Sequence, residues 1–254
     1  GESLGLWVES KTMRKNTIDN NLLYQTAMPG QQLHFNPDGK FRIAQFTDLH
    51  LDPNTEKSQQ TLRMIQDVVN KENPDLVLLT GDVVTTGPSN KGWGMIAETL
   101  EKVGKPYGVV FGNHDDEQGV DKDTLLKYYQ QYGGKYCLAY EDDPDLHGAA
   151  IHNLTVLASD SDEIKFNLWM FDTNTYVYDE NDPTKRLGYD NVREDQIEWY
   201  KEKSAELETK AGKKVYSIAF QHMTPPETYE AMFPTLPFDL SPVTETYNGG
   251  KHYP

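Results

Sequence analysis

A single cysteine, Cys137, occurs in the 254 residues of the chain. One cysteine cannot form an internal disulfide, and it cannot build a zinc site from cysteine ligands. We therefore expect Cys137 to fill part of the core beside Tyr136 and Leu138. The scarcity of cysteine fits the reducing cytoplasm, and it fits a secreted or cell-envelope protein equally well. The compartment stays open on this evidence.

Long apolar runs are missing as well. No stretch approaches the run of about 18 apolar residues that a membrane-spanning helix needs, and residues 1–6 carry no signal-peptide pattern. We therefore predict no membrane span. The chain starts with Gly1 instead of Met, which is compatible with a leader that has been removed.

Basic residues are outnumbered by acidic ones. The chain has 24 Lys and Arg against 40 Asp and Glu, a formal net charge of −16. Such a surface repels polyanions, which argues against nucleic acid or an anionic membrane as a partner. Most of these acids are expected to be solvated surface. If the protein handles phosphates, bound cations are a source of the local positive charge that it needs.

The remaining composition indicates one globular unit. Charged residues make up 25% and aromatic residues 11% of the chain, and a chain of this length can bury one large core. Residues 1–30 are polar and weakly patterned, so we expect an N-terminal arm there. Residues 31–254 then form one domain.

The first half of this domain alternates strand and helix patterns. The apolar run 41–46 and the turn signal at 36–39 predict a hairpin whose second strand leads to Asp48 and His50. If that strand stays extended, the two side chains point the same way. Further strands are expected at 76–80 and 107–111, with helices at 56–72, between 96 and 103, and at 122–132. This order implies parallel strands with right-handed crossovers, so the polar ends of these strands share one edge of a sheet.

The second half predicts another sheet. Residues 151–158 and 166–171 form apolar or alternating runs separated by a polar turn, the pattern of a hairpin packed on the first sheet. The segment 172–190 is interpreted as a long polar loop beside the site, and we assign it no ligand. Asn191 and Glu194 resemble a capping box at the start of a helix that ends at Gly212. A final strand, 215–220, leads to His222.

Four of these strands, 41–46, 76–80, 107–111 and 215–220, lead to side chains that can bind a metal ion. The candidates are Asp48, His50, Asp82, Asn113, His114 and His222. Carboxylate, imidazole and amide oxygen together suit Mn, Fe, Zn or Ni better than Ca or Mg. These groups are too many for one ion, so we predict two ions roughly 3.5–4 Å apart. Such a pair activates water and neutralises phosphate oxygens, which makes hydrolysis of a phosphoester the natural chemistry.

These residues lie in motifs that resemble a known family. Asp48-Leu49-His50, Gly81-Asp82, Gly112-Asn113-His114-Asp115 and His222 look like signature blocks of the calcineurin-like metallophosphoesterases. The segments 33–41, 196–199 and 222–225 resemble the subgroup related to the purple-acid-phosphatase-like proteins of plants and fungi. The resemblance implies an α/β fold of four layers, in which two mixed β-sheets lie between helices.

The resemblance also implies a role for each residue. Asp48 and His50 hold the first metal, Asp82 bridges both metals, and Asn113 and His222 hold the second. His114 contacts the phosphate and protonates the leaving oxygen, and Asp115 binds the His114 ring and orients it. The implied cofactors are two divalent or trivalent ions, with Mn, Fe or Zn expected. The implied partner is a small phosphorylated substrate or a phosphoprotein.

Two positions depart from the family pattern. Thr85 stands where the iron-binding tyrosine of true purple acid phosphatases would be, so we do not expect a purple protein. The closing Gly-His-x-His block has no match, the nearest sequence being 249–252 with His252, and we expect that a longer chain continues past the connector 236–254.

Three functional hypotheses follow from the sequence. The first is a dinuclear phosphomonoesterase that uses a hydroxide bridging two metal ions, and the second is a phosphodiesterase with the same site. The third is a non-catalytic or metal-depleted module, because the last ligand block is missing.

Overall fold

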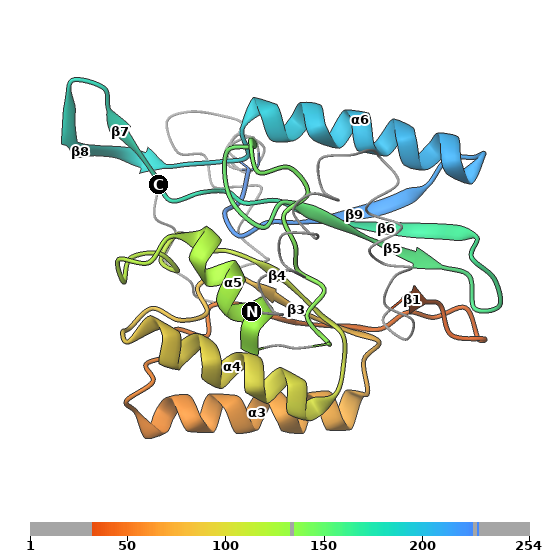
Figure 1. The fold of residues 1–254 in the computed structure, drawn as a ribbon, viewed down its shortest axis with the longest axis horizontal. Coiled ribbons are helices and arrows are strands. Elements are labelled where there is room, and N and C mark those ends of the chain that lie inside the picture. Colours follow the sequence, from red (N-terminus) through yellow and green to blue (C-terminus); the bar gives the residue numbers. More distant parts are fainter. Residues whose placement is uncertain (1–31, 133–134, 226–227, 229–254) are drawn as a thin grey trace, which may run out of the picture.

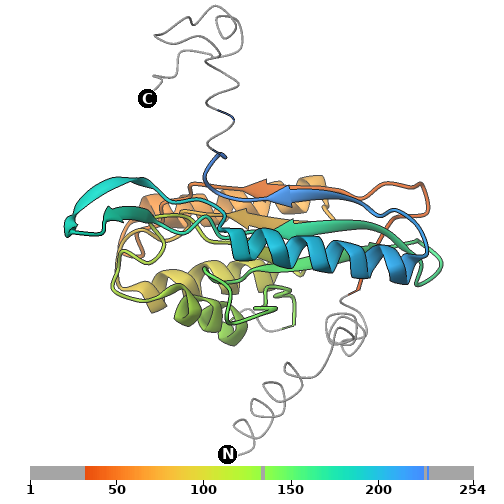
Figure 2. The same ribbon diagram turned by 90° about the horizontal axis from the view of Figure 1, so that it is seen from above.

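The structure is a computed structural model that describes residues 32–132, 135–225 and 228. Its elements stack in four layers, from helices through two sheets to a further helix (Figures 1 and 2). Three hydrophobic clusters fill the spaces between successive layers. The predicted α/β sandwich of two sheets flanked by helices is confirmed.

The first sheet is parallel, with the order β2-β3-β4. Its strands are β2 (Ile43–Phe46), β3 (Leu76–Thr80) and β4 (Tyr107–Val110). All residues of β3 and β4 are buried, because layers cover both faces of the sheet, and this explains their continuous apolar sequences. The predicted parallel arrangement is confirmed, so the C-terminal ends of the three strands lie along one edge.

Three helices cover the outer face of this sheet: α3 (Glu56–Glu72), α4 (Ser89–Val103) and α5 (Lys122–Tyr132). The first begins where the Thr55 side chain accepts a hydrogen bond from the Ser58 N–H, and it ends at Asn73 in the left-handed conformation. The rings of Trp93 and Tyr129 pack edge to face 4.9 Å apart under the sheet. The Tyr129 ring also lies 6.0 Å from that of Tyr107 in β4, which holds the helices against the strands that carry the candidate site.

The second sheet has the order β1-β5-β6-β9. Its strands are β1 (Leu33–His34), β5 (His152–Leu157), β6 (Ile164–Met170) and β9 (Tyr216–Phe220). Helix α6 (Glu194–Ala211) covers its outer face, where the rings of Trp199 and Trp169 meet edge to face at 5.6 Å. The predicted β5–β6 hairpin and the strand that leads to His222 are both confirmed.

Three local predictions were wrong. The turn at 36–39 does not join a hairpin, because β1 pairs with β5 of the second sheet whereas β2 pairs with β3 of the first. The segment 172–190 contains a two-stranded hairpin, β7 (Tyr176–Asp179) and β8 (Asp182–Tyr189), which projects at one end of the molecule (Figure 1). Helix α6 begins after Arg193, which makes no side-chain capping bond, so the capping box at Asn191 does not form.

Several predictions concern parts of the chain outside the described residues. They are the arm at 1–30, the connector 236–254 and His252. Within the described residues, no helix combines the length and the apolar character that crossing a membrane requires.

Candidate metal centre

The candidate site is built on the loops that follow β2, β3 and β4. Backbone hydrogen bonds tie the first two loops together, from the Asp48 N–H to the Gly81 carbonyl and from the His50 N–H to the Asp82 carbonyl, both at 3.0 Å. Because neighbouring parallel strands end together, side chains from separate parts of the sequence reach the same place.

The backbone at the site is strained. Asp48, His50 and Asp82 have φ angles of 53°, 45° and 51°, a left-handed conformation that non-glycine residues rarely adopt. The expectation of an extended Asp48–His50 segment was therefore wrong. The loop bends at both residues, and the bend, not strand alternation, brings their side chains together. Strain of this kind accumulates at functional sites, where the surrounding structure holds it in place.

Two glycines allow the loops to approach each other. A Cβ atom at Gly81 would lie 2.3 Å from Nδ1 of His222, and one at Gly112 would lie 2.2 Å from Oδ1 of Asp82. Gly81 also has a φ of 102°, which favours glycine. The Gly-Asp and Gly-Asn motifs thus need glycine because site side chains pack directly against the backbone.

Asp48, Asp82 and His222 converge on one point. Each offers a ligand atom that lies within 4.8 Å of the other two. Nε2 of His222 is 3.4 Å from Oδ2 of Asp82, and Nε2 of His50 is 3.6 Å from the same oxygen. Nε2 of His50 also lies 3.7 Å from Oδ1 of Asp48. Oδ2 of Asp82 is therefore the common neighbour of two imidazoles.

This donor set fits metal ions. Two ligand atoms that each lie about 2.1 Å from one ion are about 3.0–3.4 Å apart, because the ligand–metal–ligand angles are near 90–110°. The distances around Asp82 are close to this spacing, and carboxylate with imidazole suits Mn, Fe or Zn. Asp82 is 3% exposed, so a cation would balance a charge that has left water.

The neighbouring groups already shift each other's protonation. Burial acts to raise the pKa of Asp82, but the hydrogen bonds from His222 and from the His114 N–H outweigh it and lower the pKa. Burial acts to lower the pKa of His222, whereas its contacts with Asp82 and the Thr80 carbonyl raise it overall. Each shift favours the charged form of its group, so Asp82 and His222 stabilise each other at the place where a metal ion would bind.

Asn113 and His114 lie at the rim of the cluster. The His114 N–H donates to Oδ1 of Asp82 at 3.0 Å, and the His114 ring centroid is 5.9 Å from that of His50. The buried Asn113 donates from Nδ2 to the Tyr176 hydroxyl at 3.1 Å. All of the sequence-predicted ligands therefore lie in or beside one cluster.

The structure gives Asp115 a different contact from the expected one. Asp115 is fully buried, and its carboxylate accepts hydrogen bonds from the N–H groups of Asp82, Val83 and Gly112. Burial raises the pKa of Asp115 to about 6. The expected contact of Asp115 with the His114 ring is therefore wrong, because its oxygens face the backbone. Glu117 takes that place, with Oε2 2.8 Å from Nδ1 of His114.

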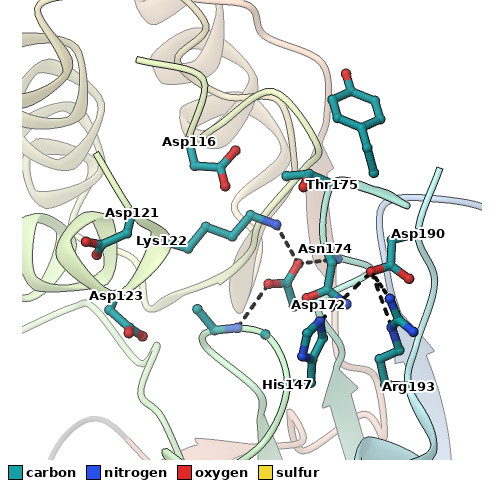
Figure 3. A pocket seen from close by; sticks show the side chains of 13 residues that line it. Asp116, Asp121, Lys122, Asp123, His147, Asp172, Asn174, Thr175, Asp190 and Arg193 are labelled. Carbon is teal, nitrogen blue, oxygen red and sulfur yellow. Dashed lines mark hydrogen bonds and ion pairs between the residues drawn. The ribbon is translucent and has the colours of Figure 1, made fainter. Parts of the chain in front are cut away.

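A pocket of about 370 Å³ adjoins this rim (Figure 3), and Tyr176 is one of the residues that line it. Inside it, Lys122 donates to Asp172 at 2.8 Å, and both side chains are almost fully buried. Beside this pair, Arg193 pairs with Asp190 at 2.7 Å. The pocket is therefore lined by charged groups, acidic ones above all.

Sequence reasoning missed Glu117 and Tyr176. Glu117 stands three residues after His114 in the turn that follows the Gly-Asn-His motif, a spacing that could have identified it. Tyr176 and Tyr178 alternate in the segment that we interpreted as a loop, and this alternation was the available strand signal.

Comparisons with known proteins agree with this geometry. The model of the family "Calcineurin-like phosphoesterase" matches residues 41–243. "Probable inactive purple acid phosphatase 14" of Arabidopsis thaliana is 27% identical over 205 residues, which cover 70% of this chain and 50% of that protein. "Phosphatase DCR2" of Saccharomyces cerevisiae is 25% identical, over 88% of this chain and 41% of that protein. The chain thus spans about half the length of these relatives, or less.

A solved structure shares the fold. A dimetal phosphatase from Danio rerio superposes with a TM-score of 0.50 at 13% identity, covering 72% of this chain and 69% of that one.

Proposed function

Because the chain belongs to the calcineurin-like phosphoesterase family, we propose that it is a dinuclear metal-dependent phosphoesterase that hydrolyses phosphomonoesters. The observation that carries the proposal is the convergence of Asp48, Asp82 and His222 within 4.8 Å. These residues come from three loops and from both sheets, so their meeting is a property of the fold.

The ligands would divide between two ions around Asp82. Asp48 and His50 would hold the first ion, and Asn113 and His222 would hold the second. The Asp82 carboxylate would serve both, since His50 and His222 approach its Oδ2 at 3.6 and 3.4 Å. This mixture of carboxylate, imidazole and amide oxygen favours Mn, Fe or Zn.

When bound, such ions lower the pKa of water towards neutrality and neutralise charge on phosphate oxygens. The residues of the chain then guide the bond changes. Oxygen from water bonds to phosphorus while the ester P–O bond breaks, and its electron pair stays on the leaving oxygen. His114 gives that oxygen a ring proton and regains one from solvent, so the products are an alcohol and inorganic phosphate.

We place the leaving group on the Tyr176 side of the cluster. The pocket of about 370 Å³ meets the rim at Tyr176, whose hydroxyl contacts Asn113. The yeast relative and the Danio rerio protein are both named as phosphatases, which supports the monoester as the substrate class. The Arabidopsis relative carries the name "Probable inactive purple acid phosphatase 14", so activity is the first property to test.

The test uses the full chain with Mn²⁺ and 4-nitrophenyl phosphate. We expect turnover, and a loss of about 100-fold or more in kcat for Asp82→Ala, because losing even an outer-shell partner of a metal costs 10–100-fold. Asp67→Ala, an exposed change on α3, is the matched control and should match the wild type. Equal rates for Asp82→Ala and the wild type would contradict the proposal.

Two further measurements separate the alternatives. Bis(4-nitrophenyl) phosphate hydrolysed faster than the monoester would identify a phosphodiesterase. A chain that holds no metal after dialysis against Mn²⁺ or Zn²⁺ and that hydrolyses neither ester would identify a non-catalytic module.

A further inference from the structure

The ring of His114 has a carboxylate partner that no sequence motif assigns. Oε2 of Glu117 lies 2.8 Å from Nδ1 of His114. Both residues belong to one tight turn, in which the Glu117 N–H donates to the His114 carbonyl at 3.3 Å. With Nδ1 bound to Glu117, Nε2 is the ring nitrogen left for a substrate, and the contact fixes the orientation of the ring.

The second oxygen of the same carboxylate contacts the β7–β8 hairpin. The Tyr176 hydroxyl donates to Oε1 of Glu117 at 3.2 Å and accepts from Nδ2 of Asn113 at 3.1 Å. One phenol therefore links the partner of His114 to a predicted metal ligand. The two hydrogen bonds use both the donor and the acceptor capacity of the hydroxyl.

The hydrogen bond from Asn113 determines which amide atom is left for a metal. An asparagine amide has one oxygen, which binds cations, and one NH₂ group, which does not. Because the NH₂ group of Asn113 is held by Tyr176, Oδ1 is the atom that remains. Asn113 is 3% exposed, so few other partners compete for its amide.

Tyr176 is itself held by the hairpin. The guanidinium of Arg186 lies 3.4 Å from the centroid of the Tyr176 ring, and the ring of Tyr189 lies 5.5 Å away. Both residues belong to β8. Stacking of a guanidinium on an aromatic face restricts the ring, so the position of the hydroxyl depends on the hairpin.

We propose that Glu117 and Tyr176 are positioning residues. Glu117 orients the proton donor His114, and Tyr176 orients the metal ligand Asn113. Glu117 fixes the His114 ring with Nε2 free for the leaving group, and Tyr176 fixes the Asn113 amide with Oδ1 free for a metal. The inference rests on the proposed function for its consequences in turnover. The contacts themselves have readouts that do not need turnover.

The first readout is the tautomer of His114. In the neutral ring, the wild type should carry its proton on Nδ1, where Glu117 accepts it. Two-bond ¹H–¹⁵N correlation spectra of ¹⁵N-histidine protein report the tautomer, and His114→Gln assigns the signal. Glu117→Gln should shift the ring towards the Nε2–H form, whereas Glu180→Gln, an exposed change in the hairpin turn, should not. An unchanged tautomer in Glu117→Gln would overturn the role of Glu117.

The second readout is metal affinity. Tyr176→Phe keeps the ring that Arg186 covers and removes the hydroxyl that holds Asn113. We expect its dissociation constant for Mn²⁺, measured by calorimetric titration, to rise about 10-fold or more, the usual effect of losing a partner that orients a ligand. Tyr178→Phe, in the same strand and 46% exposed, should bind as the wild type does. Equal affinities of Tyr176→Phe and the wild type would overturn the role of Tyr176.

Turnover then tests the consequence of both contacts. Proton donation matters most when the leaving alcohol is a poor leaving group. Glu117→Gln should therefore lower kcat for glycerol 2-phosphate about 10–100-fold while changing kcat for 4-nitrophenyl phosphate less than about 3-fold, with KM values unchanged. An equal loss on both esters would overturn the positioning of a proton donor. A wild type without turnover that still shows the tautomer and affinity changes would remove the proposed function and support the two contacts.

Discussion

Oδ1 of Asp115 accepts a hydrogen bond of 2.7 Å from the backbone N–H of Val83. The other carboxylate oxygen accepts from the N–H of Gly112 at 2.7 Å and from that of Asp82 at 3.1 Å. One fully buried side chain thus joins the loop after β3 to the loop after β4. Asp115, the last residue of the Gly-Asn-His-Asp motif, therefore holds the two site loops together, whereas Asn113 and His114 lie beside the metal cluster.

Replacing Asp115 should therefore cost stability. Asp115→Ala leaves several buried N–H donors without an acceptor, and each such donor costs about 1–3 kcal/mol. We expect the free energy of unfolding, measured by urea titration, to fall by about 3 kcal/mol or more. Asp67→Ala in the exposed face of α3 is the control, with a change within about 0.5 kcal/mol. A stable Asp115→Ala variant that has lost only activity would instead support the orienting role first expected for this residue.

Gly81 gives a second test of how the site loops are packed. Gly81→Ala places a Cβ atom 2.3 Å from Nδ1 of His222 at a φ of 102°, so the backbone or the imidazole must move. Gly39→Ala has a similar positive φ of 76° but nothing within 4 Å, so it isolates the conformational cost of about 1 kcal/mol. We expect Gly81→Ala to weaken Mn²⁺ binding while Gly39→Ala binds normally, as measured by calorimetric titration. Identical metal affinities would show that His222 is not needed where the structure places it.

Regular elements could be predicted because their signals are local. Helix α3 has the predicted bounds, since Leu62, Ile65 and Val69 mark one buried face and Pro74 follows closely. Sheet membership could not be predicted in the same way. The turn at 36–39 looks the same whether the flanking strands pair with each other or not, and the pairing of Leu33 with Val156 depends on contacts far away in the sequence.

The site residues also differ in whether local sequence signals or distant contacts place them. The rule that ligand groups follow buried parallel strands brought Asp48 and Asp82 together, and His222 followed from the strand before it. The β7–β8 hairpin was missed because β8 is almost entirely exposed, so its sequence carries no apolar alternation, and the alternation of Tyr176 and Tyr178 in the short β7 was the one strand signal. The contacts that Tyr176 makes with Glu117 and Asn113 join a hairpin to a turn, and no spacing rule encodes such a contact.

Glu141 should make stability depend on pH. Burial raises its pKa from 4.5 to about 8, so the folded state holds a proton that the unfolded state releases above about pH 4.5. The stabilisation is fully present below that pH and is lost as the pH rises towards 8. Relative to the wild type, Glu141→Gln should therefore gain more than about 1.4 kcal/mol of unfolding free energy between pH 5 and pH 8, the equivalent of one pKa unit.

Urea titrations at the two pH values measure this gain. Glu198→Gln, an exposed change on α6, should keep a constant difference from the wild type, because it removes no buried carboxyl. If the Glu141→Gln difference is also constant, Glu141 is ionised in the folded state, and the N–H groups of Ala150 and Ile151 that donate to it outweigh its burial.

Metal binding should stabilise the folded chain through His222. A ligand that binds only the folded state adds about 2.7 kcal/mol at a concentration 100 times its dissociation constant. We therefore expect the thermal midpoint to rise when Mn²⁺ is added to chelator-treated protein and to fall again with chelator. His222→Ala removes an imidazole from a cluster in which its Nε2 lies 3.4 Å from Asp82, so most of the rise should disappear.

His34→Ala is the matched control, because His34 lies in β1 and binds the Ala158 carbonyl. It should change the starting midpoint but keep the metal-dependent increment. If the thermal midpoint of His222→Ala rises with Mn²⁺ as much as that of the wild type, Mn²⁺ binds elsewhere, and the cluster around Asp82 is not the metal site.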